Sequence, residues 1–273
     1  MSLTTLLQHS LTGISLGGAY ALIAIGYSMV YGILLLINFA HADIFMMAGY
    51  FMIFSIAVMP WPVAIVVVLL ATMSIMISAI GVSYLLQNLA TYLFSALPQA
   101  YPAIPLLKRP ITIGNLHTTL VTFLTPVLTL ALVMLLMFLL KKTKIGMAMR
   151  AVSKDYDTSK LMGIKIDRII TLTFVIGSFL AAVGSILYFT DRMSVTPFSG
   201  TLPGLKCFVA AVLGGIGSVP GAVIGGFLIG IVETFLVAFG YSTYSDAFTF
   251  LLLILILLFR PTGLMGESLT EKV

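Results

Sequence analysis

Asp43 and Glu233 are the residues whose type and setting most favour chemistry, because each carboxylate interrupts a long apolar run. A third acid, Asp246, lies nearer the edge of its run. An ionisable side chain among apolar residues usually faces a bundle interior or a water-filled cavity, where it can bind a substrate, a cation or a proton. Each could instead lie near an interface or be satisfied by a hydrogen bond, and both interpretations stay open here.

Other chemistry has little support in the sequence. His41 and Asp43 are two residues apart, and such residues do not share a helix face, so no metal site is expected. Cys207 lies in an apolar context typical of a packing residue. No G-x-x-x-x-G-K-[ST] loop occurs, so an ATP-driven role requires a separate ATPase. No nucleophile and base stand out either, so we expect neither enzyme activity nor a cofactor in this chain.

The composition predicts that membrane-spanning helices position these residues. Hydrophobic residues make up 60% of the chain and charged residues 8%, with a mean hydropathy of +1.16, whereas roughly 25% of the residues in soluble domains are charged. A chain that crosses lipid must pair its backbone groups internally, as helices and closed barrels do. The apolar runs are continuous rather than alternating, which favours helices. The predicted fold class is therefore an all-α, polytopic membrane bundle.

About eight spans are expected, with broken or half helices in both halves of the chain, because one crossing takes about 20 apolar residues. Val63–Leu97 is too long for one span, and we expect a break near Ser78–Gly81. Leu205–Phe239 is also too long, and glycines interrupt it. The expected segments are Leu11–Ile37, Ile44–Met59, Val63–Leu97 in two pieces, Leu116–Leu140, Ile169–Tyr188, the interrupted Leu205–Phe239 and Ala247–Phe259, with Asp191–Pro203 as an external loop.

Two segments in different halves of the chain, 38–49 and 214–226, have polar or glycine interruptions. Paired interruptions of this kind point to the central pathway of a transporter, because unwound backbone is tolerated only where it lines a cavity or is buried in protein. Glycine also serves close helix packing, as the spacing of Gly13 and Gly17 indicates. The candidate pathway residues are Asn38, His41, Asp43, Gly214, Gly215, Gly217 and Glu233.

A basic stretch, 141–168, separates two long apolar runs. It holds eight Lys and Arg residues against three Asp, which equals the whole formal charge of +5. Lys and Arg beside a span are retained on the cytoplasmic side, so this excess favours a cytoplasmic loop over nucleic-acid binding. An apolar stripe predicts one short amphipathic helix, and Asp157 could cap a second that stops at Gly163. The stretch is either a docking element or a solvated connection that sets topology. The stripe is formed by Ile145, Ala148, Met149 and Val152.

Five blocks of the sequence resemble, in the same order, the permease subunits of bacterial branched-chain amino-acid ABC importers. Together they cover most of the chain. The blocks begin GGAYALIAIGY (17–50), IGVSYLLQNLA (80–90), KIGMAMRAVSKDYDTSKLMGIKIDR (144–187), GLKCFVAAVLGGIGSVPGAVIGG (204–226) and FRPTGLMG (259–266).

The resemblance implies a single permease domain over residues 1–273, placed in a bacterial inner membrane. It also implies a pore formed with a second, similar permease, two cytoplasmic ATPases that hold ATP and Mg, and an extracytoplasmic protein that delivers leucine, isoleucine or valine. In such importers a coupling helix of the permease fits a groove on the ATPase. Carried over to this sequence, the contacts fall on Arg150, Ala151, Asp155 and Gly163.

Two departures from the family pattern stand out. Ala42 occupies a position where the family usually has glycine, which makes a sharp unwinding there less expected. Family members also carry a longer, basic connection before the I-G-x-S segment, whereas this chain passes from Met76 to Ile80 without a charge. The third and fourth spans could be fused, the topology could differ, or the chain could be an atypical member.

Two other functions stay open at this point. Related permeases carry urea or short amides, so the resemblance identifies the family more firmly than it identifies the substrate. A stand-alone channel or secondary carrier could use Asp43 and Glu233 to bind a cation or proton. An intramembrane enzyme would need catalytic groups that the sequence does not reveal.

Overall fold

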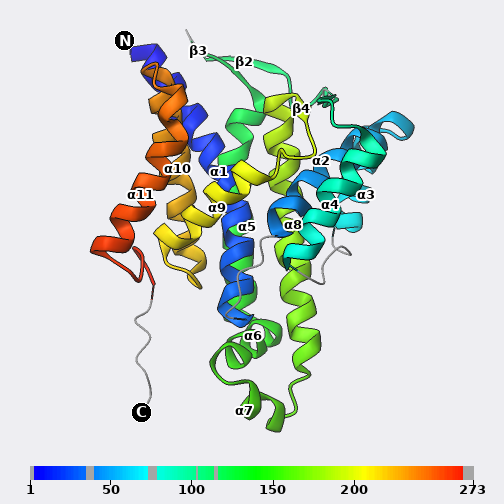
Figure 1. Ribbon diagram of the computed structural model, residues 1–273, viewed down its shortest axis with the longest axis vertical. Coiled ribbons are helices and arrows are strands. Elements are labelled where there is room, and N and C mark those ends of the chain that lie inside the picture. The colour runs from blue at the N-terminus through cyan, green and yellow to red at the C-terminus, as the bar shows by residue number, and fades with distance from the viewer. Residues whose placement is uncertain (1–2, 35–39, 73–78, 103, 114–115, 267–273) are drawn as a thin grey trace.

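The structure is a computed structural model that describes residues 3–34, 40–72, 79–102, 104–113 and 116–266. Helices dominate it, which confirms the all-α prediction (Figure 1). The central helix is α1 (Leu3–Leu34), which at about 1.5 Å per residue is about 48 Å long. Residues Ala21–Ile25 are fully buried. The helix begins eight residues before the expected Leu11, because the uncharged polar residues at its start extend it beyond the apolar run.

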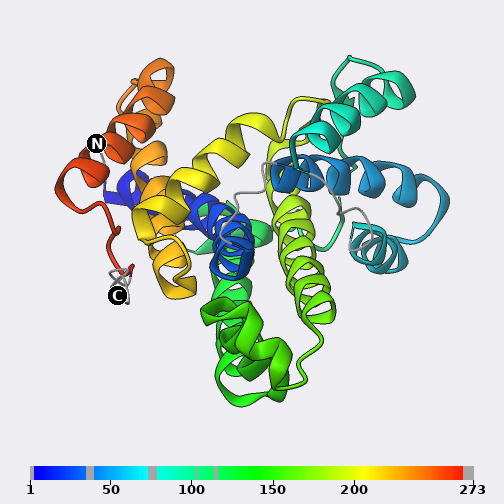
Figure 2. The ribbon, with the colours of Figure 1, turned by 60° about the horizontal axis from the view of Figure 1, so that its bottom comes forward.

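The first half of the chain continues with α2 (Ala40–Val58), α3 (Trp61–Thr72) and α4 (Ala79–Phe94). Both α3 and α4 pack against α2, and the three form one side of the molecule in Figure 2. The break expected near Ser78–Gly81 is only partly visible, since residues 73–78 lie outside the described part. Gly81 itself lies inside α4.

Short strands, which the sequence did not reveal, gather at the end of the bundle where α8 finishes (Figure 1). Strand β1 (Gln99–Ala100) pairs antiparallel with β4 (Ser194–Val195). Strands β2 (Pro110–Ile113) and β3 (Leu116–Thr119) form an antiparallel hairpin. The span expected from Leu116 therefore begins only at Leu120, because its first four residues pair as a strand.

A helical hairpin projects from the opposite end. Helices α5 (Leu120–Lys142) and α8 (Ile166–Arg192) form its arms, while α6 (Lys144–Lys154) and α7 (Tyr156–Leu161) form its tip (Figure 1). The two short helices predicted within 141–168 are thus confirmed. Helix α8 runs past the expected Tyr188 to Arg192, so the expected external loop begins two residues later.

The last part of the chain contains α9 (Thr201–Gly214), α10 (Val219–Ala238), a 3₁₀ turn (Ser242–Tyr244) and α11 (Ser245–Phe259). The interruption expected in Leu205–Phe239 is confirmed between Gly214 and Val219. Gly215 and Gly217 have φ values of +107° and +90° there, a left-handed region that glycine enters without strain.

Six helical segments in the described residues are long and apolar enough to cross a membrane. The expected number of about eight is not reproduced. Helices α3 and α9 are apolar but have 12 and 14 residues, about 18 and 21 Å, and both are shorter than a hydrocarbon core of about 30 Å. The six segments are Thr4–Ile33, His41–Val58, Leu120–Lys142, Ile166–Arg192, Val219–Ala238 and Ser242–Phe259.

Helices α1 and α10 pack backbone against backbone through glycine. A Cβ atom at Gly17 would lie 2.6 Å from the Phe227 Cα atom, and one at Gly13 would lie 3.0 Å from the Ile231 Cα atom. The close-approach face predicted from Gly13 and Gly17 is therefore confirmed, and Gly226 and Gly230 supply the matching face of α10. Such contact fixes α10, and the Glu233 it carries, against the central helix.

Candidate functional site

Asp43 links α2 to α4. Its side chain is buried, the Gln87 Nε2 atom donates a hydrogen bond to Oδ1 at 2.8 Å, and the Ser83 hydroxyl donates to Oδ2. Both carboxylate oxygens therefore accept hydrogen bonds from neutral donors on one neighbouring helix. This arrangement matches the alternative in which a hydrogen bond satisfies the acid, and a pathway role for Asp43 stays a prediction.

His41 faces different helices from Asp43. Its buried ring lies against Gly26 of α1 and 3.6 Å from a Cβ position at Gly177 of α8, and it meets the Tyr27 ring edge-on at 5.0 Å. Neither ring nitrogen has a hydrogen-bond partner within the described residues. No group of three His, Cys, Asp or Glu residues that could hold a metal ion occurs in that part of the chain either.

The segment around His41 is more helical than the sequence suggested. Ala40 to Asp43 form the first turn of α2, so these residues are not unwound. Asn38 lies outside the described residues. The methyl group of Ala42 packs against Gly204, and its carbonyl lies against Gly200. Gly204 thus makes room for the methyl group of Ala42, at a position where the family usually has glycine.

The glycine interruption after α9 is filled by backbone. Gly214 packs on Gly221, and Met265 N donates a hydrogen bond to Gly214 O at 2.8 Å. Gly217 N donates to the Ser28 hydroxyl of α1 at 3.0 Å. Close packing, the second interpretation of these glycines, accounts for the contacts of Gly214, and the pathway role of Gly214, Gly215 and Gly217 stays a prediction.

Glu233 belongs to an ionic cluster in which Lys206 and Glu233 are buried and Asp246 is half-buried. The Lys206 Nζ atom lies 2.8 Å from Glu233 Oε1 and 2.6 Å from Asp246 Oδ1, so one cation joins α9 to α10 and α11. The Tyr20 hydroxyl of α1 donates to Glu233 Oε2 at 3.0 Å. A charge removed from water needs such partners, since an unpaired buried ion is strongly unfavourable.

Sequence reasoning missed Lys206, although a signal was present. It is the one basic residue in the run Leu205–Phe239, and Glu233 is the one acid in that run. Because the run folds back at the glycine interruption, α9 and α10 pack together and the two charges meet. When an apolar run is broken into two helices, and one holds a single basic residue and the other a single acid, the pattern predicts an ion pair between them.

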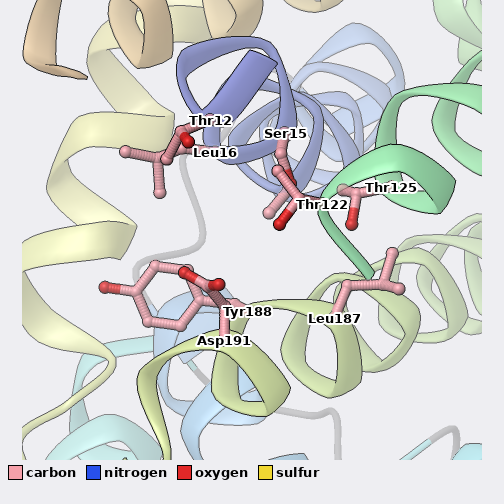
Figure 3. Close-up of a pocket in the computed structure, with 9 residues that line it drawn as sticks. Thr12, Ser15, Leu16, Thr122, Thr125, Leu187, Tyr188 and Asp191 are labelled. Carbon is pink, nitrogen blue, oxygen red and sulfur yellow. The ribbon is translucent and has the colours of Figure 1, made fainter. Parts of the chain in front are cut away.

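Two cavities lie toward the end of the bundle away from α6 and α7. The larger has a volume of about 540 Å³, and the cluster of Lys206, Glu233 and Asp246 lines it. The smaller, between α1, α5 and α8, has a volume of about 20 Å³. Figure 3 shows the Ser15 and Thr122 side chains across this space from Tyr188 and Asp191. It has room for about one water molecule, which excludes an amino acid there.

At the opposite tip, α6 and α7 are fixed by specific hydrogen bonds. The Thr143 hydroxyl caps α6 by accepting from Gly146 N at 3.1 Å, and the Arg150 Nη1 atom donates to Leu140 O at 2.6 Å. The Tyr156 hydroxyl donates to Ile33 O of α1 at 2.6 Å. Hydrogen bonds therefore connect the tip to α5 and α1.

Asp155, not Asp157, caps α7. Its Oδ1 atom accepts from Asp157 N at 2.9 Å and from Thr158 N at 3.1 Å, and the Thr158 hydroxyl donates to Oδ2. Hydrogen bonds from the side chain and backbone of Thr158 hold the pKa of the Asp155 carboxyl below its usual value. The helix ends at Leu161, and Gly163 follows with a φ of +81°.

The apolar stripe of α6 packs inward, apart from its first member. Met149 and Val152 are buried against Ile33 and Ile169, whereas Ile145 is 41% exposed. The tip also presents apolar side chains outward. Leu161 and Met162 are 87% and 79% exposed. Among the predicted coupling residues, Ala151 is half-buried and Arg150, Asp155 and Gly163 are exposed.

Comparisons with known proteins agree over nearly the whole chain. Residues 10–257 match a family described as the permease component of branched-chain amino acid transport systems. The high-affinity branched-chain amino acid transport system permease protein LivH of Escherichia coli (strain K12) is 38% identical over 303 aligned residues, covering 98% of this chain and 97% of the relative. BraD of Pseudomonas aeruginosa, with the same description, is 36% identical over 98% of each chain.

A more distant similarity is to the xylose transport system permease protein XylH of Escherichia coli (strain K12), 29% identical over 40% of this chain and 30% of that protein. No solved structure matches significantly. The alignment with LivH is longer than the 273 residues of this chain, so LivH has segments that this chain lacks. A shorter connection near Met76 stays a prediction. The full-length matches and the six long apolar segments show that this multi-pass membrane protein belongs to the family of permease components of branched-chain amino acid transport systems.

Proposed function

We propose that this chain is the permease subunit of an ABC importer for leucine, isoleucine and valine in the inner membrane. The observation that carries the proposal is similarity along the whole chain to LivH and BraD, whose names state this substrate class. Residues 1–273 form one permease domain that alternates between outward and inward access. A second, similar or identical permease completes the pore.

Two cytoplasmic ATPases, with their ATP and Mg, and an extracytoplasmic binding protein complete the importer. The permease itself holds no cofactor, catalyses no reaction and binds no nucleic acid. The composition supports this division of tasks, because the chain has no phosphate-binding loop of its own.

The hairpin tip serves as the ATPase docking element. Its basic flanks favour the cytoplasmic side, and the exposed Leu161 and Met162 offer apolar anchors for a groove. Arg150, Ala151, Asp155 and Gly163 contribute the contacts. The bonds from Arg150 to Leu140 and from Tyr156 to Ile33 carry the movement into α5 and α1.

The coupling assignment is tested by replacing residues of the tip in the reconstituted transporter. Arg150→Ala removes the hydrogen bond to Leu140, and Gly163→Val places a branched side chain at a left-handed φ. We expect each to lower leucine uptake and substrate-stimulated ATP hydrolysis at least tenfold. Arg109→Ala, an exposed arginine at the opposite end, is the matched control and keeps ATPase association.

If both tip variants retain uptake and ATPase stimulation, the coupling assignment is wrong. The substrate is tested in the same preparation, by offering urea and acetamide beside leucine. Uptake of the amides in preference to leucine would replace the proposed substrate with the amide class.

A further inference from the structure

The large cavity differs in character from the rest of the bundle interior. It is lined by residues of α8, α9, α10 and α11, and its volume of about 540 Å³ is within the range of about 300–1,000 Å³ typical of small-molecule pockets. Its walls combine charged, hydroxyl and apolar side chains. Such a mixture suits a ligand that is polar at one end and apolar at the other.

The four charged side chains that line the cavity have a net charge of zero. Arg192 and Lys206 are matched by Glu233 and Asp246. Lys206 is occupied, since it pairs with both acids. A cavity with equal numbers of both charges favours a ligand that carries both charges itself, over a net cation or anion.

Arg192 is available to a ligand. Its guanidinium carbon lies 5.3 Å from the centre of the Tyr188 ring, and within the described residues no hydrogen bond or ion pair joins it to a carboxylate. The side chain is exposed and lines the cavity. A guanidinium held against a ring presents a planar set of donors that matches a carboxylate.

The acidic side of the cavity has unused acceptors. One carboxylate oxygen of Asp246 forms the ion pair with Lys206, and the Asp246 side chain is 47% exposed. The Ser245 hydroxyl beside it is buried and has no hydrogen-bond partner among the residues described. A buried hydroxyl without a partner is unfavourable, and an ammonium group would satisfy it together with Asp246.

Apolar side chains complete the wall. Phe198, Leu202 and Val237 are 59%, 51% and 50% exposed, and all three line the cavity. An aliphatic side chain of a ligand would cover part of this surface, which is favourable because apolar area leaves water.

We infer that this cavity is a receiving site for a zwitterionic α-amino acid with an aliphatic side chain. Arg192 binds the carboxylate, Asp246 and Ser245 bind the ammonium group, and Phe198, Leu202 and Val237 contact the side chain. Lys206 and Glu233 position Asp246 and keep the cavity neutral. The inference rests on the proposed function and adds to it a site on the permease itself.

The test uses thiol labelling in the complete transporter, held in lipid nanodiscs without the binding protein. Cys207, the single cysteine, is buried, so Cys207→Ala with Ser194→Cys gives one thiol at the cavity wall. The rate of its reaction with a charged methanethiosulfonate reagent is measured against increasing L-leucine. We expect leucine to slow labelling at least fivefold at saturation. Leucinamide lacks the carboxylate and 4-methylpentanoate lacks the ammonium group, so neither should protect at the same concentration.

Residue variants then identify the contacts. Arg192→Gln should raise the leucine concentration for half-maximal protection at least tenfold, whereas Arg109→Gln, at the same end but outside the cavity, should leave it unchanged. Leu202→Ala changes an exposed side chain, so the fold is preserved, and it should weaken protection by leucine more than by alanine. ATP hydrolysis by the complex checks that each variant is assembled.

ATP-driven leucine uptake is measured in parallel with the binding protein added. Uptake without any leucine protection of the introduced thiol would overturn the receiving site and leave the proposed function standing. Protection by leucinamide equal to that by leucine would overturn the role of Arg192. Labelling that responds only to the zwitterionic lipid content of the nanodisc would assign the cavity to a lipid headgroup and overturn the inference.

Absence of leucine uptake by the wild-type complex would contradict the proposed function.

Discussion

At the scale of single residues, the two buried acids differ in the partners that satisfy them. Asp43 accepts hydrogen bonds from Ser83 and Gln87, whereas Glu233 pairs with Lys206. The sequence identified both acids as exceptional because charges are rare in apolar runs. It did not predict their partners, which come from helices that lie next to them only after folding.

Asp43→Asn should leave leucine uptake within about twofold of wild type. An amide of the same shape keeps one acceptor, and the Ser83 hydroxyl can turn to accept from the new donor. Asp43→Leu removes both acceptors, leaves two donors unpaired and should reduce the folded fraction. Uptake by the purified, ATP-energised transporter measures the effect. Loss of uptake in Asp43→Asn, with normal assembly, would favour the carrier alternative in which this acid binds a cation or proton.

Lys206→Met should lower the free energy of unfolding by about 3–5 kcal/mol, because it leaves two acids without their shared cation. Adding Glu233→Gln to this variant should recover part of the loss, since the remaining buried group is neutral. Lys154→Met, at an exposed position, should change stability by about 0.5 kcal/mol or less. Denaturant titration of the protein in bicelles measures all three. Equal stability of Lys206→Met and Lys154→Met would show that the cluster contributes little.

At the scale of elements, the sequence predicted the helices that have a strong local signal. The glycine cluster after Gly214 ends α9, and the stripe of α6 packs inward at Met149 and Val152. Features without such a signal were missed or misplaced. The two- to four-residue strands show no periodicity, and the choice between Asp155 and Asp157 as the cap of α7 depends on backbone angles that two nearby aspartates do not reveal.

Gly17→Ala should destabilise the packing of α1 on α10. The new methyl group would lie 2.6 Å from the Phe227 Cα atom, which forces the helices apart, and overpacking of this kind costs about 1–3 kcal/mol. Gly32→Ala is the matched control on the same helix, because its methyl group would lie 3.5 Å from the Gly217 Cα atom, an ordinary contact. Thermal unfolding in detergent compares the two. The predicted contact is wrong if both variants melt at the same temperature.

At the scale of the whole molecule, the two ends of the bundle differ in a way that suits coupled transport. One end carries the basic tip with exposed Leu161 and Met162, and the other carries the cavity with Arg192 and Asp246. Helices α1 and α8 extend between these ends. Composition and charge pattern predicted the membrane class and the tip. The cavity could not be predicted, because its lining residues come from segments spread along the sequence between Tyr20 and Asp246.

The most direct test of the account is leucine uptake into proteoliposomes that contain this chain with its companion permease and ATPases. Radiolabelled leucine and the binding protein are supplied outside, and ATP is enclosed or omitted. We expect leucine to accumulate against its gradient only when ATP and the binding protein are both present. Uptake of the same size without ATP, or by this chain without the ATPases, would contradict it.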